Sequence, residues 1–267
     1  HLGEYLQPAF FKELKKKPNR PFAIDTPHEL TKDLLSQARR WSDRYRSLKN
    51  EGATEKEIQD SFNEKTKMRV FAWNEKGYID TVMTPNDSIK YYKSHLRAAF
   101  MAIEPNTGHV KAYVGDINYS HFRYDMVGQA RRQVGSTIKP FLYALAMESG
   151  YSPYDQAPNE QVTYQVGDQE WTPRNASMKR YGEMVTLKWG LAQSNNWISA
   201  WLMNQLSPEL LVSLIHEFGV LNKEIDPTMS LCLGACEISV LEMVSAYTGF
   251  AKEGMRRAPR FVTKIED

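Results

Sequence analysis

Apolar residues recur at helical spacing in the first fifth of the chain. The ones that would share one helix face are Leu30, Leu34, Ala38, Trp41, Tyr45 and Leu48. Before them, residues 26–29 (Thr-Pro-His-Glu) are typical of a capping box with proline in the first turn, and Gly52 follows the last of them. The pattern predicts one helix from about residue 28 to residue 50. A second capping box, at residues 54–57, predicts a shorter helix after it.

The periodicity changes at Met68, and strands are expected from there. Two short strands are predicted at residues 68–73 and 78–83. A second hairpin is predicted at residues 98–115, because two apolar runs flank a Pro-Asn-Thr-Gly turn in which Gly108 suits a positive φ. The change of period places the domain boundary between residues 68 and 69, with a helical linker before it and the main α+β domain after it.

The rest of the chain is mainly helical in pattern, with one long irregular stretch at residues 155–181 and the beginning of a strand at residues 259–267. Helices are predicted at residues 87–92, 186–193, 197–206, 210–215 and 240–251, and another begins at Ser136 and continues through Met147. A long irregular stretch inside a domain is usually functional or poorly ordered. Residues 155–181 are therefore interpreted as either part of a functional site or a poorly ordered loop.

The candidate chemistry is concentrated in residues 131–141, Arg-Arg-Gln-Val-Gly-Ser-Thr-Ile-Lys-Pro-Phe. Gly135 allows a sharp turn just before Ser136, and the apolar run that follows is compatible with a helix. Lys139 comes three residues after Ser136 and would share its helix face. Burial would lower the pKa of such a lysine, so that its neutral amine could take the serine proton. Ser136 is the expected nucleophile and Lys139 its base.

The sequence Arg-Gln-x-Gly-Ser-x-x-Lys-Pro at residues 132–140 resembles the active-site signature of the penicillin-binding proteins, and in this long form that of the bifunctional class A. The resemblance implies a peptidoglycan D,D-transpeptidase in which Ser136 attacks the penultimate D-alanine of a stem peptide. It implies the penicillin-binding/β-lactamase-like fold, an antiparallel sheet flanked by helices, for residues 69–267. Residues 1–68 resemble the linker after the glycosyltransferase module of class A enzymes, whose own signature is absent here.

A second motif of this family, Ser-x-Asn, fits Ser194-Asn195-Asn196 at an expected helix junction. The resemblance implies that Ser194 relays a proton between Lys139 and the leaving amine and that Asn196 holds a substrate carbonyl. Residues 61–63 (Ser-Phe-Asn) fit the same short motif but lie in a polar helix without a partner motif. Trp171 and Asn175 resemble the segment that lines the substrate cleft in this family, although an ordinary surface loop explains them equally well.

Composition and other motifs narrow the alternatives. The chain has 267 residues, 34 basic and 32 acidic, and a net charge of +2, so nothing points to nucleic acid. Cys232 and Cys236 are too few for a zinc site and have no catalytic role in this interpretation, although a strained local disulfide is conceivable. The histidines are scattered, which disfavours a Ser-His-Asp hydrolase. We expect no metal and no organic cofactor.

The third family motif, Lys-Thr-Gly or Lys-Ser-Gly on a strand, does not occur in the sequence. We therefore interpret the chain as an excised and catalytically incomplete piece of the domain, inactive alone and with an unpaired edge on the hairpin of residues 98–114. One alternative is a D,D-carboxypeptidase or β-lactamase on the same fold, which uses water for deacylation. Another is a non-catalytic fragment whose residues 1–68 bind a partner.

The resemblance also implies a location and partners. The substrate of this family lies outside the cytoplasm, so we expect the protein at the outer face of the cytoplasmic membrane, or in the periplasm, with a membrane-anchored parent. Its ligands would be peptidoglycan stem peptides and β-lactam antibiotics. Other cell-wall synthesis proteins are possible partners.

Overall fold

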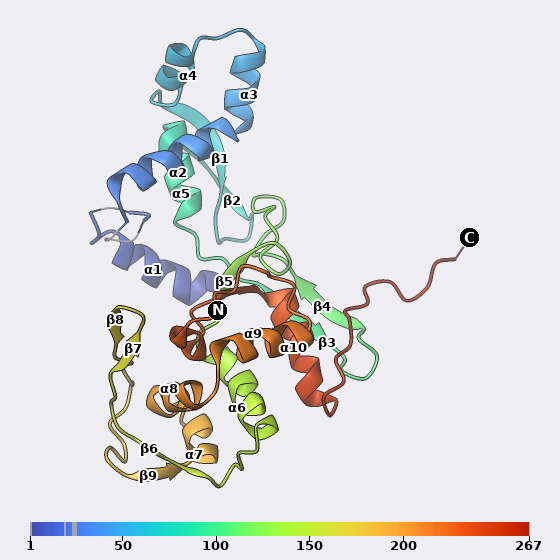
Figure 1. The fold of residues 1–267 in the computed structure, drawn as a ribbon. Helices are drawn as coiled ribbons and strands as arrows, with labels where there is room; N and C mark the ends of the chain where they lie inside the picture. The colour runs from blue at the N-terminus through green and yellow to red at the C-terminus, as the bar shows by residue number, and fades with distance from the viewer. Residues whose placement is uncertain (1, 19, 23–25, 267) are drawn as a thin grey trace. The chain divides into compact units, whose positions relative to one another are not determined.

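The computed structural model describes residues 2–18, 20–22 and 26–266. The chain forms two compact units, His1–Arg97 and Ala98–Asp267 (Figure 1). The boundary inferred from the change of period lay at residue 68 instead. The difference arises because the first β-hairpin and the helix after it pack with the N-terminal helices.

The first unit combines helices with one antiparallel hairpin. The predicted hairpin forms: β1 (Thr66–Phe71) begins and ends two residues earlier than expected, and β2 (Tyr78–Met83) has the expected bounds. The two strands pair from Thr66↔Met83 to Phe71↔Tyr78. The helices of this unit are the π-helical turn η1 (Leu2–Leu6), α1 (Gln7–Leu14), α2 (His28–Arg40), α3 (Asp43–Asn50), α4 (Glu55–Ser61) and α5 (Pro85–Lys93). The Tyr91 and Tyr92 hydroxyls of α5 hydrogen-bond the backbone of Phe71, which fixes this helix on β1.

The prediction of a single helix for residues 28–50 is wrong. The structure has two helices, because Ser42 is an N-cap whose Oγ accepts from Tyr45 N at 3.3 Å and so begins α3 separately. Trp41, placed on the expected apolar stripe, is 68% exposed. At the start of α2 the N-cap is Pro27 rather than Thr26, and no side chain caps it. The capping box at Thr54 is confirmed.

The second unit is built around α6 (Lys139–Glu148), which is buried on nearly all sides. Phe141, Leu142 and Ala146 of α6 are fully buried against α8 (Asn196–Gln205) and α9 (Pro208–Glu217). The remaining helices of the unit are η2 (Gly135–Ile138), α7 (Leu187–Ala192), η3 (Met229–Leu233) and α10 (Val240–Ala251). The hydrophobic core of this unit therefore lies directly behind the Ser-x-x-Lys segment.

All strands of the second unit pair in twos. The predicted hairpin forms as β3 (Phe100–Ile103) and β4 (Val110–Val114), and α10 packs on β3. Three short pairs were not predicted: β5 (Arg131–Gln133) with β10 (Glu237–Ser239), β6 (Gln156–Pro158) with β9 (Met184–Thr186), and β7 (Tyr164–Val166) with β8 (Gln169–Trp171). Each of these strands has three residues, too few to show a period of two.

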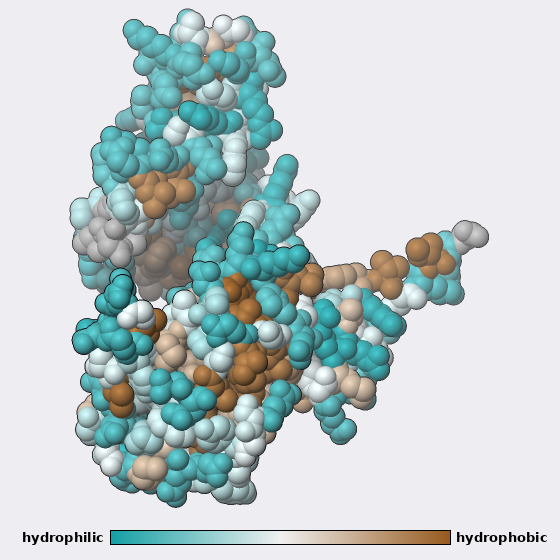
Figure 2. Space-filling view, viewed as in Figure 1, coloured by the Kyte–Doolittle hydropathy of each residue, from teal (hydrophilic) through white to brown (hydrophobic). Residues whose placement is uncertain are grey.

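The strand expected at residues 259–267 is not formed in the described part of that segment. Arg260 makes one parallel bridge to His109, in which Val110 N donates to Arg260 O at 3.0 Å. The apolar side chains that follow, Phe261, Val262 and Ile265, are exposed. Figure 2 shows brown, hydrophobic residues among hydrophilic ones along the extended C-terminal segment. Across the described residues, no helix is long and apolar enough to cross a membrane.

Candidate active site

Ser136 lies in the turn between β5 and α6, as the sequence predicts. Gly135 has φ +55° and begins the 3₁₀ turn η2, and Lys139 begins α6 with Pro140 in the first helical turn. Ser136 lies at the surface, whereas Ile138 and Lys139 are buried. The sharp turn thus leaves the serine within reach of solvent and directs the lysine into the unit.

The backbone before Ser136 is held by a ladder from a distant part of the sequence. Glu237 pairs with Gln133 in the β5–β10 ladder, and two further bonds continue toward the serine: Val134 N donates to Cys236 O at 3.1 Å and Gly135 N donates to Gly234 O at 3.2 Å. Gly234 has φ +78°, and a Cβ atom on it would overlap the backbone of Gly135. The turn therefore rests on a glycine that permits close backbone contact.

Lys139 is 1% exposed and reaches the Ser-x-Asn segment. Its Nζ donates to Ser194 O at 2.6 Å, to Asn196 Oδ1 at 2.7 Å and to Ser194 Oγ at 3.2 Å. Burial lowers the pKa of Lys139 to about 8, and the nearby thiol of Cys232 acts weakly in the opposite direction. With this pKa, about a tenth of the amine is neutral at pH 7, far more than for an ordinary lysine.

The predicted residues Lys139, Ser194 and Asn196 therefore lie in one hydrogen-bonded group. In the described part of the chain, no hydrogen bond joins Ser136 Oγ to another side chain; Lys139 contacts Ser194 and Asn196 instead. Ser194 has φ +50°, a backbone region that residues with a Cβ rarely occupy and in which active-site residues are enriched. This backbone is held by Ser194 N, which donates to Leu191 O at 2.9 Å.

Asn175 also lies at this group, but its side chain supports the backbone. Its Oδ1 accepts from Asn196 N at 3.0 Å, and Asn196 Nδ2 donates to Arg174 O at 2.7 Å. Trp171 lies in β8 and packs against Tyr164 with ring centroids 6.0 Å apart. The structure therefore brings Asn175 to the Ser-x-Asn segment and gives Trp171 a packing contact within the β7–β8 hairpin.

The rival Ser-x-Asn at residues 61–63 has local structural roles. Ser61 Oγ donates to Ile58 O at 2.7 Å, and Asn63 Oδ1 accepts from Asn86 Nδ2 at 2.8 Å.

Cys232 and Cys236 are free and buried, and burial raises the pKa of Cys232 to about 12. Among the described residues, no group of three or more His, Cys, Asp or Glu side chains could hold a metal ion.

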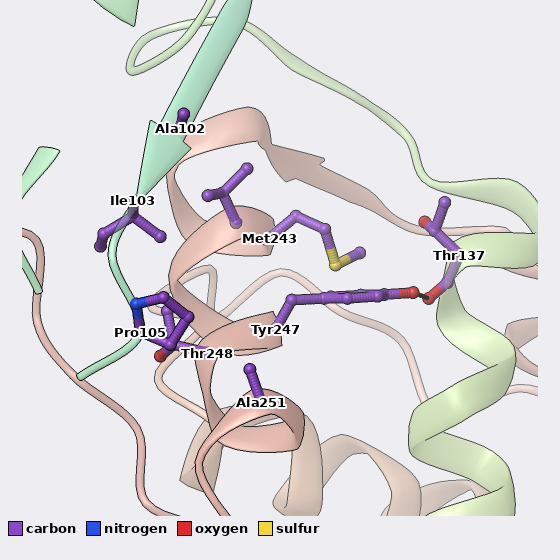
Figure 3. Close-up of a pocket in the computed structure, with 9 residues that line it drawn as sticks. Ala102, Ile103, Pro105, Thr137, Met243, Tyr247, Thr248 and Ala251 are labelled. Atoms are coloured by element: carbon purple, nitrogen blue, oxygen red, sulfur yellow. Dashed lines mark hydrogen bonds between the residues drawn. The ribbon is translucent and has the colours of Figure 1, made fainter. Parts of the chain in front are cut away.

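A cavity of about 480 Å³ lies between β3 and α10 and extends to Thr137, the residue after Ser136. Its lining is mostly apolar, as in Met243, Ile103 and Ala251 (Figure 3). Tyr247 crosses this cavity, and its hydroxyl donates to Thr137 O at 2.7 Å. The Tyr247 ring packs edge-on against Phe141. Helix α10 is thereby tied to the turn that carries Ser136.

Tyr247→Phe should remove the hydrogen bond from the Tyr247 hydroxyl to Thr137 O without disturbing the packing of the ring. We expect the free energy of unfolding in urea to fall by about 1 kcal/mol, the usual contribution of one hydrogen bond. Tyr151→Phe is the matched control, because the Tyr151 hydroxyl has no hydrogen-bond partner in the described chain while its ring packs on Trp201. Equal losses in the two variants would show that the bond to Thr137 contributes nothing.

Comparison with known proteins decides the family. Residues 17–96 match the penicillin-binding protein middle domain, and residues 98–267, well over half of the chain, match the penicillin binding protein transpeptidase domain. The chain belongs to the penicillin-binding proteins. The prediction of a class A member is confirmed, and so is the predicted fold of a sheet flanked by helices.

Individual relatives agree with this assignment. Penicillin-binding protein 1A of Rickettsia conorii is 35% identical over 175 residues, which cover 64% of this chain and 22% of the relative. Penicillin-binding protein 1A of Escherichia coli is 28% identical over 237 residues, covering 88% of this chain and 26% of the relative. The crystal structure of Penicillin-Binding Protein 1A from Haemophilus influenzae superposes with a TM-score of 0.61 and 30% identity, over 64% of this chain and 26% of that one. The chain thus spans about a quarter of the length of these relatives.

Sequence reasoning missed several residues that support the site. Tyr247 and Gly234 lie about 100 positions after Ser136 in the sequence, and no spacing rule connects them with it. Asn195 occupies the unspecified middle position of the Ser-x-Asn motif, so the motif itself gives it no role. Asn159, whose side-chain oxygen accepts a hydrogen bond from Asn195 Nδ2, lies in the stretch that was expected to be irregular. A polar residue at such a position carries no sequence signal of burial.

Proposed function

We propose that this chain contributes the acylation site of a peptidoglycan D,D-transpeptidase, and that Ser136 is the serine that penicillin acylates. The observation that carries the proposal is the amine of Lys139. It is buried, has a pKa lowered to about 8, is bonded to Ser194 and Asn196, and lies one helical turn from a serine at the surface. An amine of this kind is suited to general base catalysis near neutral pH.

In the proposed reaction, neutral Lys139 takes the proton of the Ser136 hydroxyl while Oγ attacks the carbonyl carbon of the penultimate D-alanine. The tetrahedral intermediate collapses as its C–N bond breaks, and the departing D-alanine amine receives a proton from Lys139 through Ser194. The amine of a second stem peptide then attacks the ester carbonyl and gives a proton to Lys139. The ester C–O bond breaks, and Lys139 returns this proton to Ser136 Oγ, which restores the hydroxyl and the neutral amine. The backbone N–H of Ser136 would be one oxyanion donor.

The geometry supports the individual roles to different extents. Ser194 Oγ lies 3.2 Å from Lys139 Nζ, a distance that suits a proton relay. Asn196 uses its Oδ1 on Lys139 and one Nδ2 hydrogen on Arg174 O, so the second Nδ2 hydrogen would be the donor to a substrate carbonyl. Lys139 and Ser136 would approach in the substrate complex, since catalytic hydrogen bonds are often incomplete without substrate. Trp171 and Asn175 remain candidates for the wall of the substrate cleft.

The proposed substrate and location follow from the family. Stem peptides lie outside the cytoplasm, so the site would work at the outer face of the cytoplasmic membrane, and β-lactams would acylate Ser136 as substrate analogues. The 267 residues contain no Lys-Thr-Gly. Loss of a single oxyanion donor lowers rates by about 10²–10³-fold. A second oxyanion donor and a substrate carboxylate site would therefore be needed beside the residues described here.

The decisive experiment is to incubate the protein as its gene encodes it with benzylpenicillin and to map the adduct by mass spectrometry. We expect one adduct in the native protein, on the peptide that contains Ser136, and none after heat denaturation. An adduct on another serine, or no adduct in protein shown to be folded, would overturn the proposal.

The fate of the acyl group separates transpeptidation from its rivals on the same fold. A stem-peptide donor should be supplied with and without an amine acceptor. Transfer to the amine supports a transpeptidase, whereas hydrolysis of the peptide at the same rate in both mixtures identifies a carboxypeptidase. Turnover of benzylpenicillin to its hydrolysed product, in a separate incubation, identifies a β-lactamase.

A further inference from the structure

Two buried asparagine side chains join the segment of residues 160–182 to the start of α8. Asn159 is 0% exposed and Asn195 is 2% exposed. Asn195 Nδ2 donates to Asn159 Oδ1 at 2.7 Å, a hydrogen bond between residues 36 positions apart. Buried amides without partners are strongly unfavourable, so each side chain depends on the other.

On one side of the pair, Asn159 closes the segment. Its Nδ2 donates to Lys179 O at 2.9 Å and to Arg180 O at 2.7 Å. Its backbone bonds both ways across the base of the segment: its N–H donates to Glu183 O and its carbonyl accepts from Gly182 N, each at 2.9 Å. Both donors of the Asn159 amide and its oxygen are therefore in use. The segment closed in this way contains Asn175, the partner of Asn196 N.

On the other side, Asn195 begins α8. Its Oδ1 accepts from Trp197 N at 2.8 Å and from Ile198 N at 3.1 Å, which is an N-cap. Its own N–H donates to Gly190 O at 2.9 Å. Together with the bond to Asn159, these contacts fix both the side chain and the backbone of Asn195, which lies between Ser194 and Asn196.

Those two neighbours supply all the oxygen atoms to which Lys139 Nζ donates in the described structure. Ser194 O accepts at 2.6 Å while the Ser194 backbone is left-handed, φ +50°. A residue with a Cβ stays in that region only where its surroundings fix it. The anchored Asn195 is the next residue in the chain and is part of that fixation.

We propose that the Asn159–Asn195 pair is a positioning device: it holds Ser194 and Asn196 around Lys139 and couples the segment of residues 160–182 to the base. The inference rests on the proposed acyl transfer and adds two positioning residues to it. A movement of the segment away from α8 must break the buried pair, and the acceptors of Lys139 then lose their fixed geometry. Substrate bound along the segment would thereby stabilise the arrangement in which the base is active.

The test is a double-mutant cycle with Asn159→Leu and Asn195→Ser. At position 159, leucine has a volume similar to that of asparagine but cannot form the hydrogen bond. At position 195, the serine side chain is too short to reach Asn159 but is still a good N-cap for α8. Each single variant should lower the first-order acylation rate constant for benzylpenicillin about ten- to a hundredfold, with little change in the preceding dissociation constant. The double variant should be no worse than the more damaged single variant, because both remove one interaction.

The pH dependence of the acylation rate distinguishes positioning from a general loss of stability. A variant that is only less stable would keep the pH midpoint of the wild type. The titratable group that faces Lys139 is Cys232 from η3, and the burial of Lys139 dominates over its effect. If water reaches Lys139 when the pair is broken, the pKa of the amine rises toward its ordinary value. The midpoint of acylation against pH should then move upward in both single variants.

Gln7→Leu is the matched control. Gln7 is a buried amide of the first unit, 1% exposed, that donates to Ser94 O and accepts from Leu96 N. It should lower the stability to urea without changing the acylation rate or its pH midpoint. If Asn159→Leu behaves like Gln7→Leu in all three measurements, the pair is only structural and the proposal fails.

A direct titration of Lys139 by NMR tests the Asn159–Asn195 pair independently of the proposed acylation of Ser136. If the wild-type protein forms no penicillin adduct, the proposed function fails, but the Lys139 titration in the variants still tests the pair. An upward shift of the Lys139 pKa in both single variants supports positioning, and an unchanged pKa in both overturns it.

Discussion

Lys139→Ala should lower the rate of Ser136 acylation by penicillin by about 10²–10⁴-fold, the usual effect of losing a general base. The reason is the state of this amine, which is buried, has a pKa lowered to about 8 and bonds three oxygen atoms of Ser194 and Asn196. The measurement is the second-order rate constant for fluorescent penicillin in the protein as its gene encodes it. Lys139→Arg separates the role of a base from that of a positive charge, because arginine keeps the charge but cannot lose its proton.

The pH dependence follows from the same shift. Only the neutral amine can accept the serine proton, so wild-type acylation should rise with pH and level off above about 8. An arginine variant that acylates nearly as fast as wild type would show that Lys139 supplies charge and not a base. A wild-type midpoint near the ordinary lysine pKa of about 10.4 would contradict the lowered value.

Stability should respond to the same group. The pKa of folded Lys139, about 8, lies below the unfolded value, so between these two pH values the unfolded chain binds more protons. The contribution of Lys139 to stability is therefore unfavourable below about pH 8 and improves as pH rises from about 8 to about 10.4. Lys139→Met should lose this rise, which is measurable as the difference between the two urea-unfolding profiles against pH.

The parts of the site that were predicted correctly depend on residues that are close together in the sequence. The turn at Gly135, the start of α6 and the approach of Ser194 and Asn196 to Lys139 belong to motifs of about three to nine residues. Their residue types carry the chemistry, and their spacing sets the local backbone. The same holds for the hairpins β1–β2 and β3–β4, whose turns contain glycine between apolar runs.

The parts that were missed depend on pairings between distant residues. The partners in β5–β10 lie about 100 positions apart and those in β6–β9 about 30, and three-residue strands give no period to recognise. The break at Ser42 was missed because an apolar stripe suggested continuity, whereas the serine side chain caps a new helix. Asn159 and Asn195 are polar residues whose burial is possible only because they meet.

Gly234→Val should destabilise the second unit more than any other substitution proposed for it. The position has φ +78°, where a side chain is strained, and any Cβ there would overlap the backbone N, C and O of Gly135. Neither group can move without breaking other bonds, because Gly135 N donates to Gly234 O and Val134 N donates to Cys236 O in the same ladder. We expect the free energy of unfolding to fall by more than about 3 kcal/mol, at the upper end of single-residue effects.

Gly254→Ala is the matched control for backbone strain alone, since this glycine has φ +88° and a Cβ atom added to it would meet nothing within 4 Å. It should lower the free energy of unfolding by only about 1–2 kcal/mol. Gly234→Ala should exceed this clearly, because it adds the overlap with Gly135 to the same strain. In the fraction of Gly234→Ala that still folds, acylation should be slower than in Gly254→Ala, since the displaced backbone is the residue directly before Ser136. Equal losses of stability in the two alanine variants, with equal acylation, would mean that the Gly135 turn is free to shift and does not depend on Gly234.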